Sequence, residues 1–157
     1  MGSVSSLDDF KKTYFEECAE LLDALYSQLT NLAEQQSDGE TLHAIFRAVH
    51  SIKGGGGAFG FDRLVAFAHV LETLLDLVRD GRVDVTEEII ALLQRATDAL
   101  SDIIDATRSG DELPDGFEDE LLRALQEAAE GGAPVGVAWP TVSQITMAVA
   151  PKLIAVV

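Results

Sequence analysis

Residues 48–61 have the sequence AVHSIKGGGGAFGF, in which one histidine and one lysine precede a run of four glycines. Apolar residues at helical spacing lead into this segment from residue 41, and a second helical pattern starts directly after it at Asp62. Two helices joined by so short a connection are expected to lie antiparallel and in contact. The segment therefore predicts a helical hairpin that turns just beyond the glycines.

Three more segments repeat apolar residues at steps of three and four, the spacing of an amphipathic helix. Five helices are expected, over residues 7–36, 41–52, 62–80, 86–110 and 114–131. The expected start signals are a capping box of Ser6 with Asp9, the N-caps Asp62 and Thr86, and Pro114, and the expected C-terminal glycines are Gly39, Gly81, Gly110 and Gly131. Long amphipathic helices with short connections predict an all-α fold, an antiparallel four-helix bundle with an additional C-terminal helix.

One domain is expected, because 157 residues suffice for a single buried core with a tail left over. The bundle is assigned to residues 7–130, and residues 1–6 are interpreted as an expression scar or a disordered N-terminus. Residues 131–157 are interpreted as a linker or a docking tail. After residue 132 the only charged side chain is Lys152, and three prolines interrupt an otherwise apolar sequence. Both interpretations of the tail stay open.

The apolar stripes of the helices are expected to form the core. The stripe of the first helix starts at Leu7 and Phe10, and that of the last contains Phe117 and Leu125. Cys18 is the only cysteine, so it forms no intramolecular disulfide and is expected to be a small core residue.

The charge of the chain restricts its partners. It carries 27 Asp and Glu against 11 Lys and Arg, a formal net charge of -16. Nucleic acids and anionic membranes would repel such a surface, so protein partners are favoured. No secretory signal and no apolar span long enough for a bilayer are evident, which favours the cytoplasm, and polar outer faces favour a monomer. Residues 41–61, however, contain no Asp or Glu. We expect a negatively charged group to bind there.

His50 is the candidate reactive residue of this acid-free segment. Lys53 lies one helical turn away, and both side chains are expected to face solvent. If the next helix runs antiparallel, its outward residues His69 and Glu72 come level with His50. Glu72 can then accept a hydrogen bond from one imidazole nitrogen and leave the other with a lone pair directed to solvent. Such an imidazole is a competent nucleophile toward phosphorus, and Lys53 would offset the phosphoryl charge.

The glycines can serve this histidine in a specific way. Gly54 and Gly57 follow His50 by four and seven residues and share its face, so their missing side chains would let a partner's active site approach. Phe46 and Phe59 are expected to join them in a contact surface, although both phenylalanines could equally belong to the core. The alternative is that the run only ends the helix before a tight turn.

Other functions remain as alternatives. A helical scaffold or adaptor would use the glycines only for close packing and would bury His50. A metal site could be built from His50, His69 and Glu72, but bundles that bind metals need inward carboxylates on several helices, and none is evident. The glycines match neither a dinucleotide fingerprint, which needs a preceding strand, nor a P-loop, since Lys53 comes before them.

Two motifs carry a family resemblance: HSIKGGxxxFGF at residues 50–61 and HxxExLLD at residues 69–76. This pattern resembles the N-terminal histidine phosphotransfer domain of CheA-type chemotaxis kinases. The resemblance is strongest over residues 45–81 and extends over residues 7–130. One departure is Gly56-Gly57-Ala58, where many relatives have Ala-Gly-Thr. The lost hydroxyl leaves the chemistry intact.

The resemblance implies that His50 is phosphorylated from ATP by a kinase domain and passes the phosphoryl group to an aspartate of CheY-like and CheB-like response regulators. It implies that Glu72 is the hydrogen-bond partner of His50, with Lys53 and His69 as supporting polar groups. The chain has no nucleotide-binding motif, so no cofactor is expected in it, and ATP and Mg²⁺ belong to the partner domains. An excised domain or a split system is expected.

Overall fold

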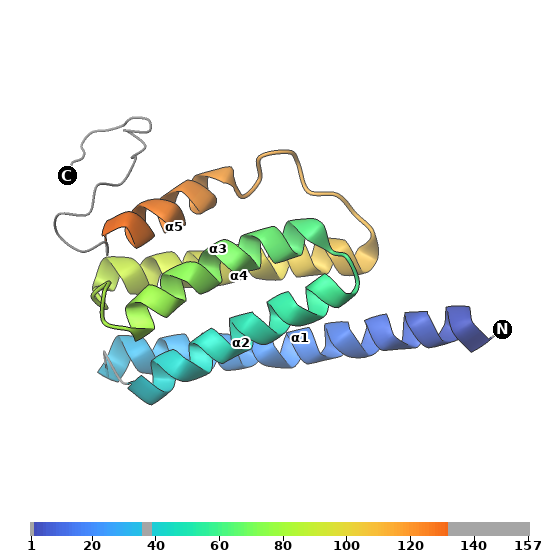
Figure 1. Cartoon of the computed structure of the whole chain (residues 1–157), viewed down its shortest axis with the longest axis horizontal. Helices are drawn as coiled ribbons and strands as arrows, with labels where there is room; N and C mark the ends of the chain where they lie inside the picture. The colour runs from blue at the N-terminus through green and yellow to red at the C-terminus, as the bar shows by residue number, and fades with distance from the viewer. Residues whose placement is uncertain (1, 36–38, 132–157) are drawn as a thin grey trace.

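The computed structural model describes residues 2–35 and 39–131. Its five helices are α1 (Gly2–Gln35), α2 (Gly39–Ala58), α3 (Asp62–Arg79), α4 (Glu87–Ser109) and α5 (Asp119–Gly131). Helices α1 to α4 form an antiparallel bundle in which each contacts the next and α4 returns to α1, and α5 packs on α3 and α4 (Figure 1). The predicted all-α bundle with an additional C-terminal helix is confirmed. The described residues contain no strand.

The core is built from the predicted apolar stripes. Cys18 is fully buried, and Leu125 is the buried residue through which α5 joins the bundle. The largest fully buried side chains are Leu25, Leu29, Leu32, Ile45, Ile52, Leu64, Phe67, Leu71, Leu74, Leu75, Leu93 and Leu100. Helices α2 and α3 are joined by only three residues, and Gly60 among them has a φ of 76° that a larger side chain rarely adopts. This short turn makes α2 and α3 direct neighbours.

Helix α1 differs from its prediction at the start. It begins at Gly2 and runs through Ser6, so there is no capping box at Ser6 and Asp9. Leu7 and Phe10 are 49% and 65% exposed, not part of the core. The reason is length: α1 has 34 residues and its neighbours α2 and α4 have 20 and 23. Its first turns therefore extend past the ends of the other described helices (Figure 1).

The helix ends follow the predicted signals in part. Thr86 is the N-cap of α4 and accepts a hydrogen bond from the Ile89 N–H at 3.1 Å, and Gly110 ends this helix with a φ of 79°, as predicted. Asp62 is not the N-cap of α3. Phe61 occupies that position without a side-chain hydrogen bond, and Asp62 is the first helical residue, where its charge suits the positive end of the helix. Gly39 starts α2 instead of ending α1.

The last helix starts later than predicted. Helix α5 begins at Asp119, and residues 114–118 form a turn in place of the first helical turn. Phe117, expected in the core, is 41% exposed because it lies in this turn. The linker or docking tail is predicted over residues 131–157; Gly131 is the last residue of α5, and the rest of this segment lies outside the described residues. None of the described helices combines the length and apolarity that crossing a membrane requires.

Arg63 holds the turn before α5 in place. Its guanidinium donates to both carboxylate oxygens of Glu118, at 2.9 and 2.7 Å, and to the carbonyl oxygens of Leu113 and Pro114. The hydrogen bonds from Arg63 to Glu118 lower the pKa of the Glu118 carboxyl below its usual value, although its burial acts in the opposite direction. One side chain of α3 thus binds the middle and the α5 end of the α4 to α5 connection.

Removal of this contact should loosen α5 alone. For Arg63→Ala we expect amide hydrogen exchange in α5 to become about tenfold faster, while exchange in the bundle core stays unchanged, because α5 is the helix that this contact anchors. Arg123→Ala, at an exposed arginine of α5, is the matched control and should leave exchange as in the wild type. Equal protection of α5 in both variants would show that Arg63 does not anchor it.

Candidate functional site

Three predicted residues meet at the seam between α2 and α3. His50 and Lys53 extend from α2, and Glu72 faces them from α3. Nδ1 of His50 is hydrogen-bonded to Oε2 of Glu72, and Nζ of Lys53 donates to Oε1 of the same carboxylate at 2.5 Å. Both carboxylate oxygens are thereby engaged. The geometry agrees with the expected antiparallel register, which brings Glu72 level with His50.

Glu72 is more buried than predicted. It was expected on an outward face, but only 11% of its side chain is exposed, against 60% for His50. Burial alone would raise the pKa of the Glu72 carboxyl. The hydrogen bonds from Lys53 and His50, together with the positive charge of Lys53, outweigh burial and lower the pKa below its usual value. Glu72 is therefore a buried, ionised anchor for the imidazole.

The other nitrogen of His50 is the reactive one. With Nδ1 bound to a carboxylate, the neutral imidazole carries its proton on Nδ1 and its lone pair on Nε2. Nε2 makes no hydrogen bond to any residue in the described part of the chain, and the ring is largely exposed. An oriented lone pair at an exposed ring nitrogen is a nucleophile that a second protein can reach.

Lys53 contacts the pair formed by His50 and Glu72, whereas His69 does not. Lys53 directs its ammonium group to Glu72, so it also stabilises the buried carboxylate. His69 is exposed on α3, as predicted, and its side chain has no hydrogen bond to the residues that the structure describes. The supporting role of His69 stays a prediction.

The four glycines of residues 54–57 are all helical and divide into two pairs. A Cβ at Gly55 would lie 2.3 Å from the Tyr14 ring, and one at Gly56 would lie 2.9 Å from Leu64. The Tyr14 hydroxyl donates to the carbonyl oxygen of Ile52 at 2.6 Å, which holds its ring against α2. The inner pair is therefore required by packing. Gly54 and Gly57 have open space around a Cβ, so packing within the described chain does not require them.

Alanine substitutions should separate the two pairs. We expect Gly55→Ala to lower the free energy of unfolding by about 1 to 3 kcal/mol, because the buried and hydrogen-bonded Tyr14 cannot move away. Gly54→Ala should raise it by about 0.5 to 1 kcal/mol, the helix propensity difference. Denaturant titration of both variants measures the two changes. A loss of stability in Gly54→Ala as large as in Gly55→Ala would contradict this division.

The two predicted contact phenylalanines lie in different surroundings. Phe46 is half-buried, and its ring is stacked on the His50 imidazole. Phe59 is half-buried at the end of the bundle, where its ring packs on those of Tyr14 and Phe61. Neither is a freely exposed apolar side chain. Their role in partner contact stays a prediction.

Sequence reasoning missed a group that extends from Phe46. The guanidinium of Arg79 lies over the Phe46 ring, and Asp76 and His43 contact the same guanidinium. A signal existed for this group. His43 lies seven residues before His50 and Arg79 lies seven after Glu72, so an antiparallel hairpin brings them level as well.

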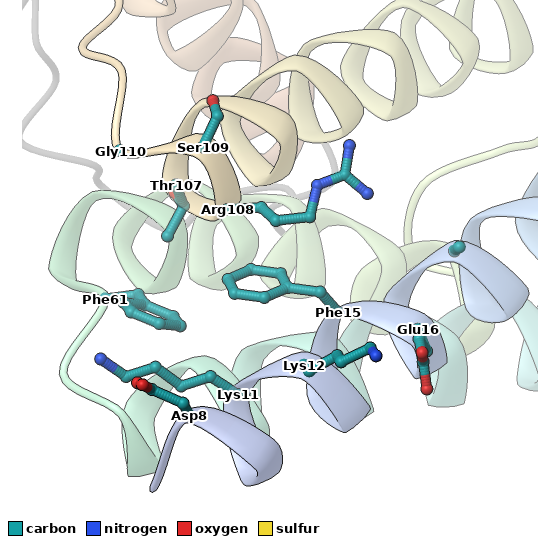
Figure 2. A pocket seen from close by; sticks show the side chains of 11 residues that line it. Asp8, Lys11, Lys12, Phe15, Glu16, Phe61, Thr107, Arg108, Ser109 and Gly110 are labelled. Atoms are coloured by element: carbon teal, nitrogen blue, oxygen red, sulfur yellow. The ribbon is translucent and has the colours of Figure 1, made fainter. Parts of the chain in front are cut away.

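Among the residues that the structure describes, no other feature competes with this seam as a site. Within the described ranges no three His, Cys, Asp or Glu side chains are grouped so that they could hold a metal ion. A hollow of about 640 Å³ lies between α1 and the end of α4, and Figure 2 shows Phe15 and Phe61 within it. Its lining mixes both signs of charge, as in Lys11 and Glu16, and includes none of the residues that surround His50.

Comparisons with known proteins agree with the motifs. The model of the Hpt domain family matches residues 9–110. The chain is 40% identical over 145 residues to the chemotaxis protein CheA of Rhizobium meliloti, which covers 92% of this chain and 19% of that protein. It is 46% identical over 124 residues to CheA of Cereibacter sphaeroides, covering 77% of this chain and 18% of that protein. The chain thus spans less than a fifth of the length of these curated relatives.

A solved structure supports the same assignment. The phosphorylated P1 domain of CheA3, in complex with CheY6 from R. sphaeroides, is similar with a TM-score of 0.73 and 28% sequence identity. The similarity covers 80% of this chain and 99% of that one. The resemblance to the phosphotransfer domain of CheA-type kinases is confirmed, and the chain belongs to the Hpt domain family.

Proposed function

We propose that His50 carries a phosphoryl group between a histidine kinase catalytic domain and response regulators of the CheY and CheB type. The observation that carries this proposal is the exposed imidazole whose Nδ1 is held by a buried carboxylate, which leaves Nε2 as an accessible nucleophile. Membership of the Hpt family and the likeness to a phosphorylated P1 domain support it. The relay would operate in the cytoplasm, where ATP is available.

The first step is phosphorylation of His50. The Nε2 lone pair attacks the γ-phosphorus of ATP, the bond from phosphorus to the bridging oxygen breaks, and ADP leaves with that electron pair. No proton needs to be removed, because Nε2 carries none. The ring becomes positively charged, with its proton still on Nδ1, and the Glu72 carboxylate opposite Nδ1 stabilises this charge. ATP and Mg²⁺ belong to the kinase domain.

The second step returns the imidazole to its initial state. A carboxylate oxygen of the regulator's aspartate attacks phosphorus, the bond between Nε2 and phosphorus breaks, and the electron pair returns to Nε2. A neutral imidazole is a good leaving group, and Glu72 keeps its orientation for the next cycle. Lys53, beside the seam, adds positive charge that favours the dianionic phosphoryl group while it is bound.

The face around His50 is suited to a second protein's active site. His43, Arg47, His50, Gly54 and Gly57 follow one another at steps of three and four, and all five are exposed along α2. This stripe is basic at one end and without side chains at the other. Gly54 and Gly57 would let a regulator's loops reach Nε2, and Arg47 would attract the acidic groups of its active site.

A bulky side chain at Gly54 tests this docking face. We expect Gly54→Leu to slow transfer from phosphorylated His50 to a CheY-like regulator by about tenfold or more, because the side chain separates the two reacting groups. Phosphorylation by phosphoramidate, a donor small enough to pass, should stay within about twofold. Ala91→Leu adds a leucine to an exposed face of α4 and is the control. A wild-type rate of phosphoryl transfer in Gly54→Leu would show that the glycines are not part of the docking face.

A further inference from the structure

A column of three side chains leads from the end of α3 to the reactive imidazole. Phe46 precedes His50 by one helical turn, and the two rings are nearly parallel, with 9° between their planes and 5.9 Å between their centroids. The Cζ atom of Arg79 lies 4.0 Å from the centroid of the Phe46 ring. These values are those of an offset aromatic stack and of a close cation–π contact. The column thus connects α3 to His50 by a route separate from Glu72.

The guanidinium of Arg79 is itself held in place. Asp76 accepts a hydrogen bond from it at 2.6 Å, and Nδ1 of His43 lies 3.4 Å from its other terminal nitrogen. Asp76 and Arg79 share a face of α3, and His43 approaches from α2. A cation held from both helices limits the movement of the ring beneath it. Phe46, in contact with this cation and with His50, is therefore restrained.

His50 needs a restraint of this kind. Its hydrogen bond to Glu72 fixes one ring nitrogen, but a single hydrogen bond does not by itself fix the plane of the ring. The imidazole is 60% exposed, so packing limits this rotation on few sides. The direction of the Nε2 lone pair depends on the ring orientation, and displacement at phosphorus needs the attacking atom in line.

We propose that Arg79 is a positioning residue, which acts through Phe46 to fix the plane of the His50 imidazole for attack on phosphorus. The effect on phosphoryl transfer rests on the proposed function, whereas the effect on the ring orientation does not. Arg79 acts on His50 without touching it, so the two substitutions Arg79→Ala and Phe46→Leu should not be additive.

The experiment uses the full chain and two measurements. One is the NMR signal of the His50 ring carbons and protons, assigned by comparison with His50→Gln. The other is the rate of His50 phosphorylation by phosphoramidate, in which the new bond from Nε2 to phosphorus replaces the phosphorus–nitrogen bond and ammonia leaves. Arg108→Ala is the matched control, because Arg108 makes the same bridge to an aspartate three residues earlier, Asp105, as Arg79 makes to Asp76.

We expect Arg79→Ala to shift the His50 ring signals and to slow phosphorylation about three- to fivefold, which corresponds to about 0.6 to 1 kcal/mol of a cation–π contact. Arg79→Lys should recover part of the rate, since an ammonium also binds an aromatic face. In the Phe46→Leu background, Arg79→Ala should have no further effect. Arg108→Ala should change neither measurement, and thermal unfolding should confirm that all variants are folded.

Two results would overturn the proposal. One is an unchanged ring signal and rate in Arg79→Ala, and the other is an equal loss of rate with and without Phe46, which would mean that Arg79 acts by its charge alone. If even the wild type accepts no phosphoryl group, from phosphoramidate or from a kinase domain, then the proposed function fails. The ring signals still decide in that case whether Arg79 orients His50.

Discussion

His50→Gln should accept no phosphoryl group when it is incubated with a CheA-type kinase domain and labelled ATP. Glutamine is close in size and can still donate a hydrogen bond to Glu72, so the seam between α2 and α3 should stay intact. Its amide nitrogen has no free lone pair, because that pair is delocalised into the carbonyl. We therefore expect incorporation of label to fall to background, measured by autoradiography of the separated chains.

The chain supplies its own controls for this result. It has three histidines, and the other two, His43 and His69, are exposed on the same two helices. His43→Gln and His69→Gln should keep most of the label, and that label should be lost in acid, as phosphorus–nitrogen bonds are. Label that persists on His50→Gln would contradict the assignment of His50 as the phosphorylated residue. Loss of label in all three variants would instead indicate a damaged docking surface.

Glu72→Gln should have the second-largest effect. The substitution keeps the shape of the side chain but removes the negative charge that stabilises the positively charged ring formed on phosphorylation. We expect phosphorylation by the kinase domain to slow on the order of 10- to 100-fold, less than for an electrostatic group in a fully closed site because His50 is largely exposed. Glu72→Ala should be at least as slow.

Glu118→Gln is the matched control for Glu72. Both carboxylates are buried, both bind a cation, and both have a pKa below the usual value of 4.5. Glu118→Gln should therefore cost stability without slowing phosphorylation. A wild-type phosphorylation rate in Glu72→Gln would show that Glu72 has no role in the mechanism. If Glu118→Gln were phosphorylated as slowly as Glu72→Gln, the loss of rate would be due to lower stability.

The lowered pKa values also predict how stability depends on pH. A carboxylate whose pKa is lower in the folded state contributes stability that is fully present above its unfolded pKa, about 4.5, and is lost as the pH falls through its folded pKa. Denaturant titrations of the wild type should show this loss, and Glu72→Gln should show a smaller one. Kinetic assays near pH 7 lie above this range, so differences in rate there do not reflect acid-induced unfolding.

The fold was predictable from the sequence because its helices carry strong periodic patterns and short connections. The predictions of local structure were wrong where contacts with another part of the chain determine the structure. Leu7 and Phe10 are exposed because α1 extends past the bundle, and this extension depends on the lengths of the other helices. Tyr14 packs against Gly55 and Gly56 of the helical glycine run, a contact between residues about 40 positions apart that no local propensity reports. The turn at residues 114–118 is bound by Arg63, about 50 positions earlier in the chain.

The site was predictable to the extent that helix geometry alone determines it. A spacing of three residues places Lys53 beside His50, and the antiparallel hairpin brings Glu72 opposite. The burial of Glu72 was missed because the width of the seam between α2 and α3 depends on packing. Arg79 was missed because its contact is with Phe46 and not with His50, and only the register of the whole hairpin brings these residues together.

The position of the phosphoryl group on the imidazole is the most direct test of the central claim. The wild-type chain, labelled with ¹⁵N in histidine, is phosphorylated by a kinase domain, and the coupling of ³¹P to each ring nitrogen of His50 is recorded by NMR. Because Glu72 occupies Nδ1, we predict a phosphorus bond to Nε2 of His50 that disappears when an unlabelled CheY-like regulator is added. A phosphoryl group on Nδ1, on another residue, or on no residue of the chain would contradict the account.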